Sequence, residues 1–148
     1  MNKCFGFPKR EKLCGVTRVS HLFREGESFF AFPFKVVYLV SDSISQRNNN
    51  PELKVLFSVG KRYNKRAVAR NLIKRRSREA FRLNKHCFYE KFGASGTFLT
   101  GREVWMALIY ISKKEEDFLT IQHGIEKTLH ILIESIEKRV DIPAGLAD

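Results

Sequence analysis

Residues 61–85, KRYNKRAVARNLIKRRSREAFRLNK, form the most informative stretch of this chain of 148 residues. Good helix formers fill it from residue 65 onward, and neither Gly nor Pro interrupts it, so it predicts one helix over 65–85. The stretch contains eleven Lys or Arg residues and a single acid, Glu79. A helix with so little negative charge indicates a strongly cationic surface.

A helical projection at about 100° per residue gives this segment two unlike sides. Arg76 departs from the pattern, because it falls on the apolar side and must extend its guanidinium toward solvent. Phe81 also departs, because it falls on the polar side, where it could stack on a base or lie beneath a loop. The polar side holds Arg70, Asn71, Lys74, Arg75, Arg78, Arg82 and Lys85. The apolar side holds Val68, Ala69, Leu72, Ile73, Ala80 and Leu83.

Basic helix faces are often only solvated surfaces, but the charge pattern here favours binding to a polyanion. A solvated basic helix face usually carries Glu residues among its Lys and Arg residues. Without Glu, the like charges repel one another unless a polyanion neutralises them. The whole chain carries 27 Lys and Arg against 16 Asp and Glu, a net charge of +11. The guanidinium fork matches phosphate oxygens, and Asn71 offers a neutral donor and acceptor to a base edge or a 2′-hydroxyl. These features predict a nucleic-acid-binding helix.

Hydrophobic periodicity predicts the elements on either side of this helix. Before it we expect a short helix over 16–25, an edge strand ending at Pro33, a strand over 34–40, a polar hairpin loop over 41–52 and an antiparallel partner strand over 53–59. After it we expect a glycine-rich loop at 93–101, a central buried strand at 104–111 and an amphipathic helix at 118–140, in which a break would fall near Gly124.

The element order αβββαβα predicts an α+β fold with helices on one four-stranded mixed sheet. A single RNA-binding domain is expected over 16–142. A mobile basic arm is expected over 1–15, because its cations show no period of 2 or 3.6, and a frayed tail is expected over 143–148.

Three cysteines, Cys4, Cys14 and Cys87, without a CxxC pair support neither a disulfide framework nor a zinc site. No run of 18 apolar residues occurs, and the first fifteen residues are charged where a secretory signal would be apolar. A cytoplasmic protein is therefore expected.

The strings SVGKR (58–62) and AVARNLIKRRSREAFR (67–82) resemble the signature of the bacterial ribonuclease P protein subunit. One departure is Leu72, which stands where the family pattern has a further Arg, so one cation is lost. Similarity in pattern extends over about residues 8–135 and includes a Phe-basic-x-Gly turn at 23–26. The matching helix positions are Ala67, Val68, Arg70, Asn71, Ile73, Lys74, Arg75, Arg78, Glu79, Phe81 and Arg82.

This resemblance implies a fold like that of a ribosomal protein S5 domain, with a left-handed βαβ crossover. It also implies an endoribonuclease whose catalytic groups lie in a large partner RNA. That RNA holds the Mg²⁺ that activates water, and it removes the 5′ leader from precursor tRNA. The protein would be the accessory subunit of this ribonucleoprotein, with no catalytic residue and no metal site of its own.

Site residues follow from the resemblance by position. Contact with the catalytic RNA or the cleavage site is implied for Arg70, Asn71, Lys74, Arg75, Arg78 and Arg82. The leader would lie in a cleft between the first helix and the sheet, stacking on Phe23 and Tyr38. Its phosphates would meet Lys61, Arg62, Lys113 and Lys114.

Two other functions remain open from the residues alone. A general or ribosome-associated RNA-binding protein would use the same basic face without any role in processing. A protein that is itself a nuclease would need converging carboxylates or histidines, and near the basic face only Glu79 is available.

Overall fold

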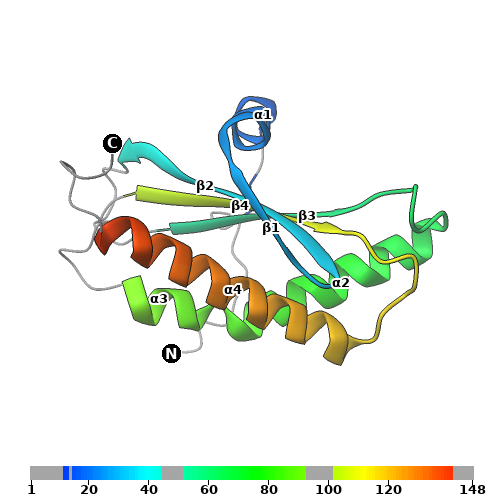
Figure 1. Cartoon of the computed structure of the whole chain (residues 1–148). Coiled ribbons are helices and arrows are strands. Elements are labelled where there is room, and N and C mark those ends of the chain that lie inside the picture. Colours follow the sequence, from blue (N-terminus) through cyan, green and yellow to red (C-terminus); the bar gives the residue numbers. More distant parts are fainter. Residues whose placement is uncertain (1–11, 14, 45–51, 93–101, 142–148) are drawn as a thin grey trace.

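The computed structural model describes residues 12–13, 15–44, 52–92 and 102–141. The elements follow the order α1 (Val16–Glu25), β1 (Glu27–Ala31), β2 (Phe34–Ile44), β3 (Glu52–Val59), α2 (Ala67–Asn84), α3 (His86–Phe92), β4 (Arg102–Tyr110) and α4 (Phe118–Asp141). Figure 1 shows α1 on one face of the sheet and the other three helices on the opposite face. The α+β architecture predicted from the sequence is confirmed, and α3 is an additional short helix.

The sheet has the strand order β1-β2-β4-β3. The β1–β2 and β2–β4 pairs are antiparallel, whereas β3 pairs with β4 in parallel. The predicted hairpin between the second and third strands is therefore wrong, because β4 lies between them. The sequence between β2 and β3 is polar and of hairpin-loop length, but local sequence does not specify which strand becomes the neighbour. Residues 45–51 of the predicted loop lie outside the described residues, as do 93–101.

β4 occupies the middle of the sheet, as its apolar run predicts. α4 continues without a break through Gly124, contrary to the expected interruption. A Cβ at Gly124 would lie 2.6 Å from the Phe32 carbonyl oxygen and 2.6 Å from Pro33 Cδ. Glycine therefore serves here for close approach between the β1–β2 turn and α4.

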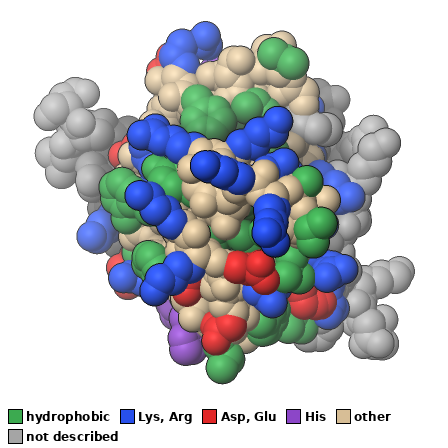
Figure 2. Space-filling model, turned by 90° about the vertical axis from the view of Figure 1, so that its right-hand side faces the viewer, with side chains coloured by type: hydrophobic (Ala, Val, Ile, Leu, Met, Phe, Trp, Pro, Cys, Tyr) green, Lys and Arg blue, Asp and Glu red, His purple; other side chains and the backbone are tan. Residues whose placement is uncertain are grey.

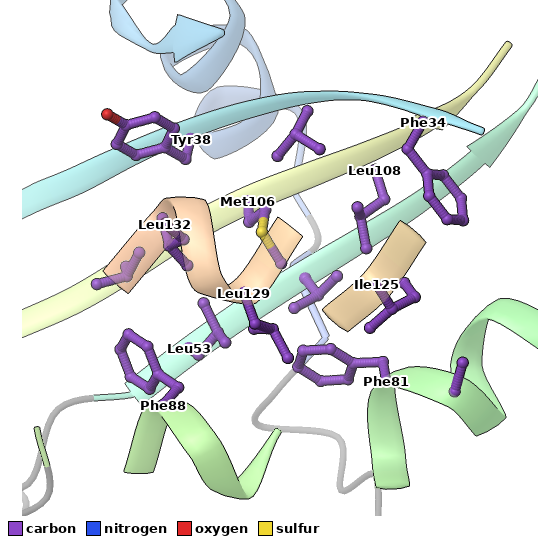
Figure 3. Packing of buried hydrophobic residues seen from close by; sticks show 14 of the residues in the cluster. Phe34, Tyr38, Leu53, Phe81, Phe88, Met106, Leu108, Ile125, Leu129 and Leu132 are labelled. Carbon is purple, nitrogen blue, oxygen red and sulfur yellow. The ribbon is translucent and has the colours of Figure 1, made fainter. Parts of the chain in front are cut away.

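Two apolar clusters hold the layers together. The larger one lies between the sheet and the helices α2, α3 and α4, and Figure 3 shows Phe34, Met106 and Leu108 of the sheet extending toward the helical layer. The smaller one lies on the other face, where Leu22 of α1 packs with Val37, Trp105 and their neighbours. Alternation along β2 and β4 thus supplies apolar side chains to both faces.

The end of the predicted arm contacts the sheet at the outer edge of β3. Leu13 is 3% exposed, and its backbone N–H donates to the Val55 carbonyl oxygen at 2.9 Å. The mobility predicted for residues 1–11 and the fraying predicted for 143–148 lie outside the described residues. None of the helices in the described ranges is long and apolar enough to cross a membrane.

Candidate nucleic-acid interface

α2 is anchored by a narrow buried stripe formed by Ile73, Ser77, Ala80 and Phe81. The Phe81 ring packs edge-to-face with Phe57 of β3 at a centroid distance of 6.1 Å. The Ser77 hydroxyl donates to the Ile73 carbonyl oxygen at 2.8 Å, so this buried polar group is paired within the helix.

The buried side of α2 is rotated from the one that the helical projection predicts. Phe81, expected on the polar side, is fully buried, and Lys85 is only 3% exposed. Val68, expected in the core, is 80% exposed. The large aromatic ring fills the space between α2 and β3, so it decides the azimuth more than the smaller apolar side chains do.

The opposite side of α2 carries an arginine face, defined here as Asn71, Arg75, Arg78 and Arg82. Asn71, Arg75 and Arg78 are exposed, and Arg82 is half-buried. Together with Glu79, the three arginines line a shallow cleft of about 220 Å³. Because Arg75, Arg78 and Arg82 are spaced three or four residues apart, their side chains project from one side of α2.

The described acidic side chains pair with only some of the arginines of α2. Nε and Nη2 of Arg82 both donate to the Glu79 carboxylate, and this pairing lowers the pKa of Glu79 below its usual value. Arg76, predicted to extend its guanidinium toward solvent, is half-buried instead. Its Nη1 donates to the Glu116 carbonyl oxygen at 2.7 Å and lies 3.8 Å from Glu115 Oε1. Among the described acidic side chains, none lies within ion-pairing distance of Arg75 or Arg78.

Arg70 and Lys74 do not belong to this exposed face. Arg70 is half-buried, and its Nη1 donates to the carbonyl oxygens of Asn64 at 2.9 Å and Lys65 at 2.7 Å. Its guanidinium therefore fixes the start of α2. Lys74 is half-buried and lines a second cleft, of about 300 Å³, with Lys12 and Arg78 beside the edge of β3.

A second basic surface lies at the carboxyl end of β3 and β4. These strands run parallel with Val59 opposite Tyr110, so the loops that follow them leave the sheet at the same edge. The loops carry four exposed cations, which we name the loop cations: Lys61, Arg62, Lys113 and Lys114. Figure 2 faces this end of the molecule and shows Lys and Arg side chains gathered over its upper and middle parts, with acidic side chains lower down.

The structure does not bring the two predicted stacking residues together. Phe23 of α1 is 46% exposed. Tyr38 is 5% exposed and belongs to the cluster on the face opposite α1, where its ring packs on Phe29 and its hydroxyl donates to Glu27 Oε2 at 3.3 Å. Tyr38 therefore presents no open ring face to a strand of RNA beside α1, and this part of the predicted cleft is wrong.

An exposed aromatic that the sequence analysis missed lies on the α1 side of the sheet. Phe30 is 65% exposed, and Lys35 Nζ lies 5.9 Å above its ring. The available signal was the adjacency of Phe29 and Phe30 in an edge strand, since neighbouring strand residues point to opposite faces.

Metal binding by the chain itself is not supported in the part of the chain that is described. No three His, Cys, Asp or Glu side chains converge there on a common point that could hold an ion.

Comparisons with known proteins agree on one family. A family model described as ribonuclease P matches residues 7–128. A ribonuclease P protein component from Porphyromonas gingivalis W83 is 32% identical over 125 residues, covering 84% of this chain and 85% of that protein. Another from Chlorobaculum tepidum is 40% identical over 79 residues, covering 53% of this chain and 51% of that protein.

Solved structures share the fold at lower identity. The RNase P protein of Staphylococcus aureus superposes with a TM-score of 0.57 at 22% identity and covers 84% of this chain and 96% of its own. The RNase P protein of Thermotoga maritima gives 0.55 at 23% identity, with 84% and 97% covered. The four-stranded mixed sheet with its helices is thus common to all three chains.

Proposed function

Because this chain belongs to the ribonuclease P protein family, we propose that it is the protein subunit of a ribonuclease P ribonucleoprotein. In this role it binds the catalytic RNA and the 5′ leader of precursor tRNA, and it assists the Mg²⁺-dependent endonucleolytic removal of the leader. The catalytic groups and the Mg²⁺ belong mainly to the partner RNA. The same proposal places the protein in the cytoplasm with its RNA partners.

The observation that carries the proposal is the arginine face on the solvent side of α2. Arg75 and Arg78 project from a helix whose opposite side is buried, so the core fixes the backbone positions from which they extend. Because the helix backbone is already ordered, these side chains can meet successive phosphates at the entropic cost of their own rotamers alone. We assign this face to the catalytic RNA, and we assign Arg70 to holding the start of α2.

The leader is assigned to the α1 side of the sheet and the loop cations. Phe23 supplies an exposed ring there, and base stacking on aromatic side chains tolerates any sequence. Lys61, Arg62, Lys113 and Lys114 supply charge for the leader phosphates. This combination suits a subunit that must handle many different leaders.

The direct test is reconstitution with the catalytic RNA at limiting Mg²⁺. The protein, the RNA and both together are each incubated with precursor tRNA carrying a labelled 5′ leader. We expect cleavage with both components, little with the RNA alone and none with the protein alone, because the protein offsets phosphate repulsion that Mg²⁺ would otherwise screen.

Two outcomes of this assay would contradict the proposal. Cleavage by the protein alone would identify it as a nuclease. No enhancement over the RNA alone would favour a general or ribosome-associated RNA-binding protein.

Replacing Phe23 with Ala should reduce the preference for leader-bearing tRNA over mature tRNA by about tenfold, since one stacked base contributes about 1–3 kcal/mol. The measurement is the ratio of dissociation constants of the reconstituted enzyme for the two tRNAs. Phe32→Ala is the matched control, because Phe32 is 60% exposed but lies in the turn packed on α4. An unchanged ratio in Phe23→Ala would remove Phe23 from the leader site.

A further inference from the structure

The two loops that carry the loop cations are joined by a buried amide. Asn64, in the loop between β3 and α2, is 7% exposed. Its Nδ2 donates to the carbonyl oxygen of Ser112 at 3.1 Å, across 48 residues of sequence. Its own backbone N–H donates to the Gly60 carbonyl oxygen at 3.3 Å, which closes the loop around Lys61 and Arg62.

Ser112, whose carbonyl oxygen accepts this hydrogen bond, organises the second loop, which joins β4 to α4. Its hydroxyl accepts from the Lys114 backbone N–H at 3.1 Å and donates to Glu116 Oε2 at 2.7 Å. The buried Tyr110 hydroxyl accepts from the Glu116 backbone N–H at 3.0 Å and donates to the Lys114 carbonyl oxygen. The backbone N–H and carbonyl oxygen of Lys114 are therefore both paired, which holds the turn that carries Lys113 and Lys114.

Both loops are also tied to α2. The Arg70 guanidinium donates to the Asn64 carbonyl oxygen in the first loop, and the Arg76 guanidinium donates to the Glu116 carbonyl oxygen in the second. The polar chain Arg70–Asn64–Ser112–Glu116–Arg76 thus leaves α2, crosses both loops and returns to α2. Such a closed network fixes geometry more firmly than its separate bonds would.

Asn64 and Ser112, at the middle of the network, are buried, whereas the four loop cations that it supports are exposed and repel one another. Without a tie between the loops, this repulsion would favour their separation. We propose that Asn64 and Ser112 are positioning residues, which hold the Lys61–Arg62 and Lys113–Lys114 pairs at a separation where one RNA strand contacts both. The inference rests on the proposed function, since it concerns the leader part of that interface.

Asn64→Ala tests the tie, because it removes the bridging amide without changing charge. Asn84→Ala is the matched control, since Asn84 Nδ2 also donates to a backbone carbonyl oxygen, that of Ala80 at 2.8 Å, but within α2 alone. Asn64→Ala should bind an oligouridylate of about ten nucleotides about five- to tenfold more weakly than the unsubstituted protein at low salt. The log–log slope of its affinity against salt concentration should become shallower by the equivalent of about one phosphate contact. Asn84→Ala should match the unsubstituted protein in both respects.

A double-mutant cycle separates positioning from a general loss of stability. Lys113→Ala is made in the unsubstituted protein and in the Asn64→Ala protein, with folding of each checked by circular dichroism. If Asn64 acts through the position of Lys113, the loss caused by Lys113→Ala shrinks from about fivefold to less than about twofold in the Asn64→Ala background. Equal losses in the two backgrounds would overturn the proposal. Ser112→Ala repeats the cycle from the second loop.

The same cycle with a linear polyphosphate of about ten phosphates distinguishes this inference from the proposed function. Binding of polyphosphate with non-additive losses, but no binding of oligouridylate, would retain the positioning role and reject the RNA role. If a probe binds and the affinity losses caused by Asn64→Ala and Lys113→Ala simply add, only the positioning role is rejected. Binding of neither probe would reject both.

Discussion

Replacing Arg75 and Arg78 together with Ala is expected to weaken binding of the catalytic RNA by about 100-fold or more at low salt. Each guanidinium can donate charge-assisted hydrogen bonds to phosphate, and each such bond contributes about 1.5–3 kcal/mol. Both side chains are exposed, and no described acidic side chain pairs with them, so little folding stability should be lost with them. The measurement is the dissociation constant of the protein–RNA complex at fixed salt and Mg²⁺.

Lys91→Ala combined with Lys127→Ala is the control for net charge. These two exposed cations lie on α3 and α4, outside the arginine face, and their removal changes the net charge by the same amount. We expect this double variant to bind the RNA within about threefold of the unsubstituted protein, because charges away from a contact are screened. Equal losses in the two double variants would mean that overall charge, and not the arginine face, drives binding.

Replacing Phe81 with Ala is expected to lower the free energy of unfolding by about 3–5 kcal/mol, the range observed for large-to-small substitutions of buried aromatics. Phe81 is fully buried between α2 and the sheet, against Phe57. Val68→Ala, on the exposed side of the same helix, should change the unfolding free energy by less than about 0.5 kcal/mol. Urea unfolding at 25 °C measures both.

These two substitutions test the azimuth of α2. If Val68→Ala were the more destabilising change, the helix would be turned as the helical projection predicts. The exposed cationic face would then also include Arg70, Lys74 and Lys85, the other basic residues on the polar side of the projection.

The order of elements was predictable, because period-2 and period-3.6 patterns alternate clearly along this chain. The α1 helix ends before Gly26 as expected, and the central strand follows from its unbroken apolar run. The order of the strands within the sheet was harder to predict from the sequence. Pairing of β3 with β4 depends on a crossover through α2 and α3, and nothing in residues 52–59 distinguishes that partner from β2.

The residue types that form the candidate site could be predicted better than the positions of their side chains. The projection placed Arg75, Arg78 and Arg82 on one side correctly, but it also placed Arg70 there. It weighted Val68 and Leu83 like Phe81, and only packing shows that the large ring fixes the buried side. Tyr38 illustrates the same limit, since the face of a strand residue follows from the layer that covers it. The tie between Asn64 and Ser112 spans 48 residues and has no local signal.

The central claim is that a row of arginines along one side of α2 neutralises RNA phosphates, and salt dependence measures this most directly. The dissociation constant of the complex with the catalytic RNA should be determined from low to high monovalent salt at constant Mg²⁺. For about six to eight neutralised phosphates, the log–log slope of the association constant should lie between about −4 and −7, and it should be shallower for the Arg75 and Arg78 double variant. A slope of about −1, unchanged in that variant, would contradict this claim.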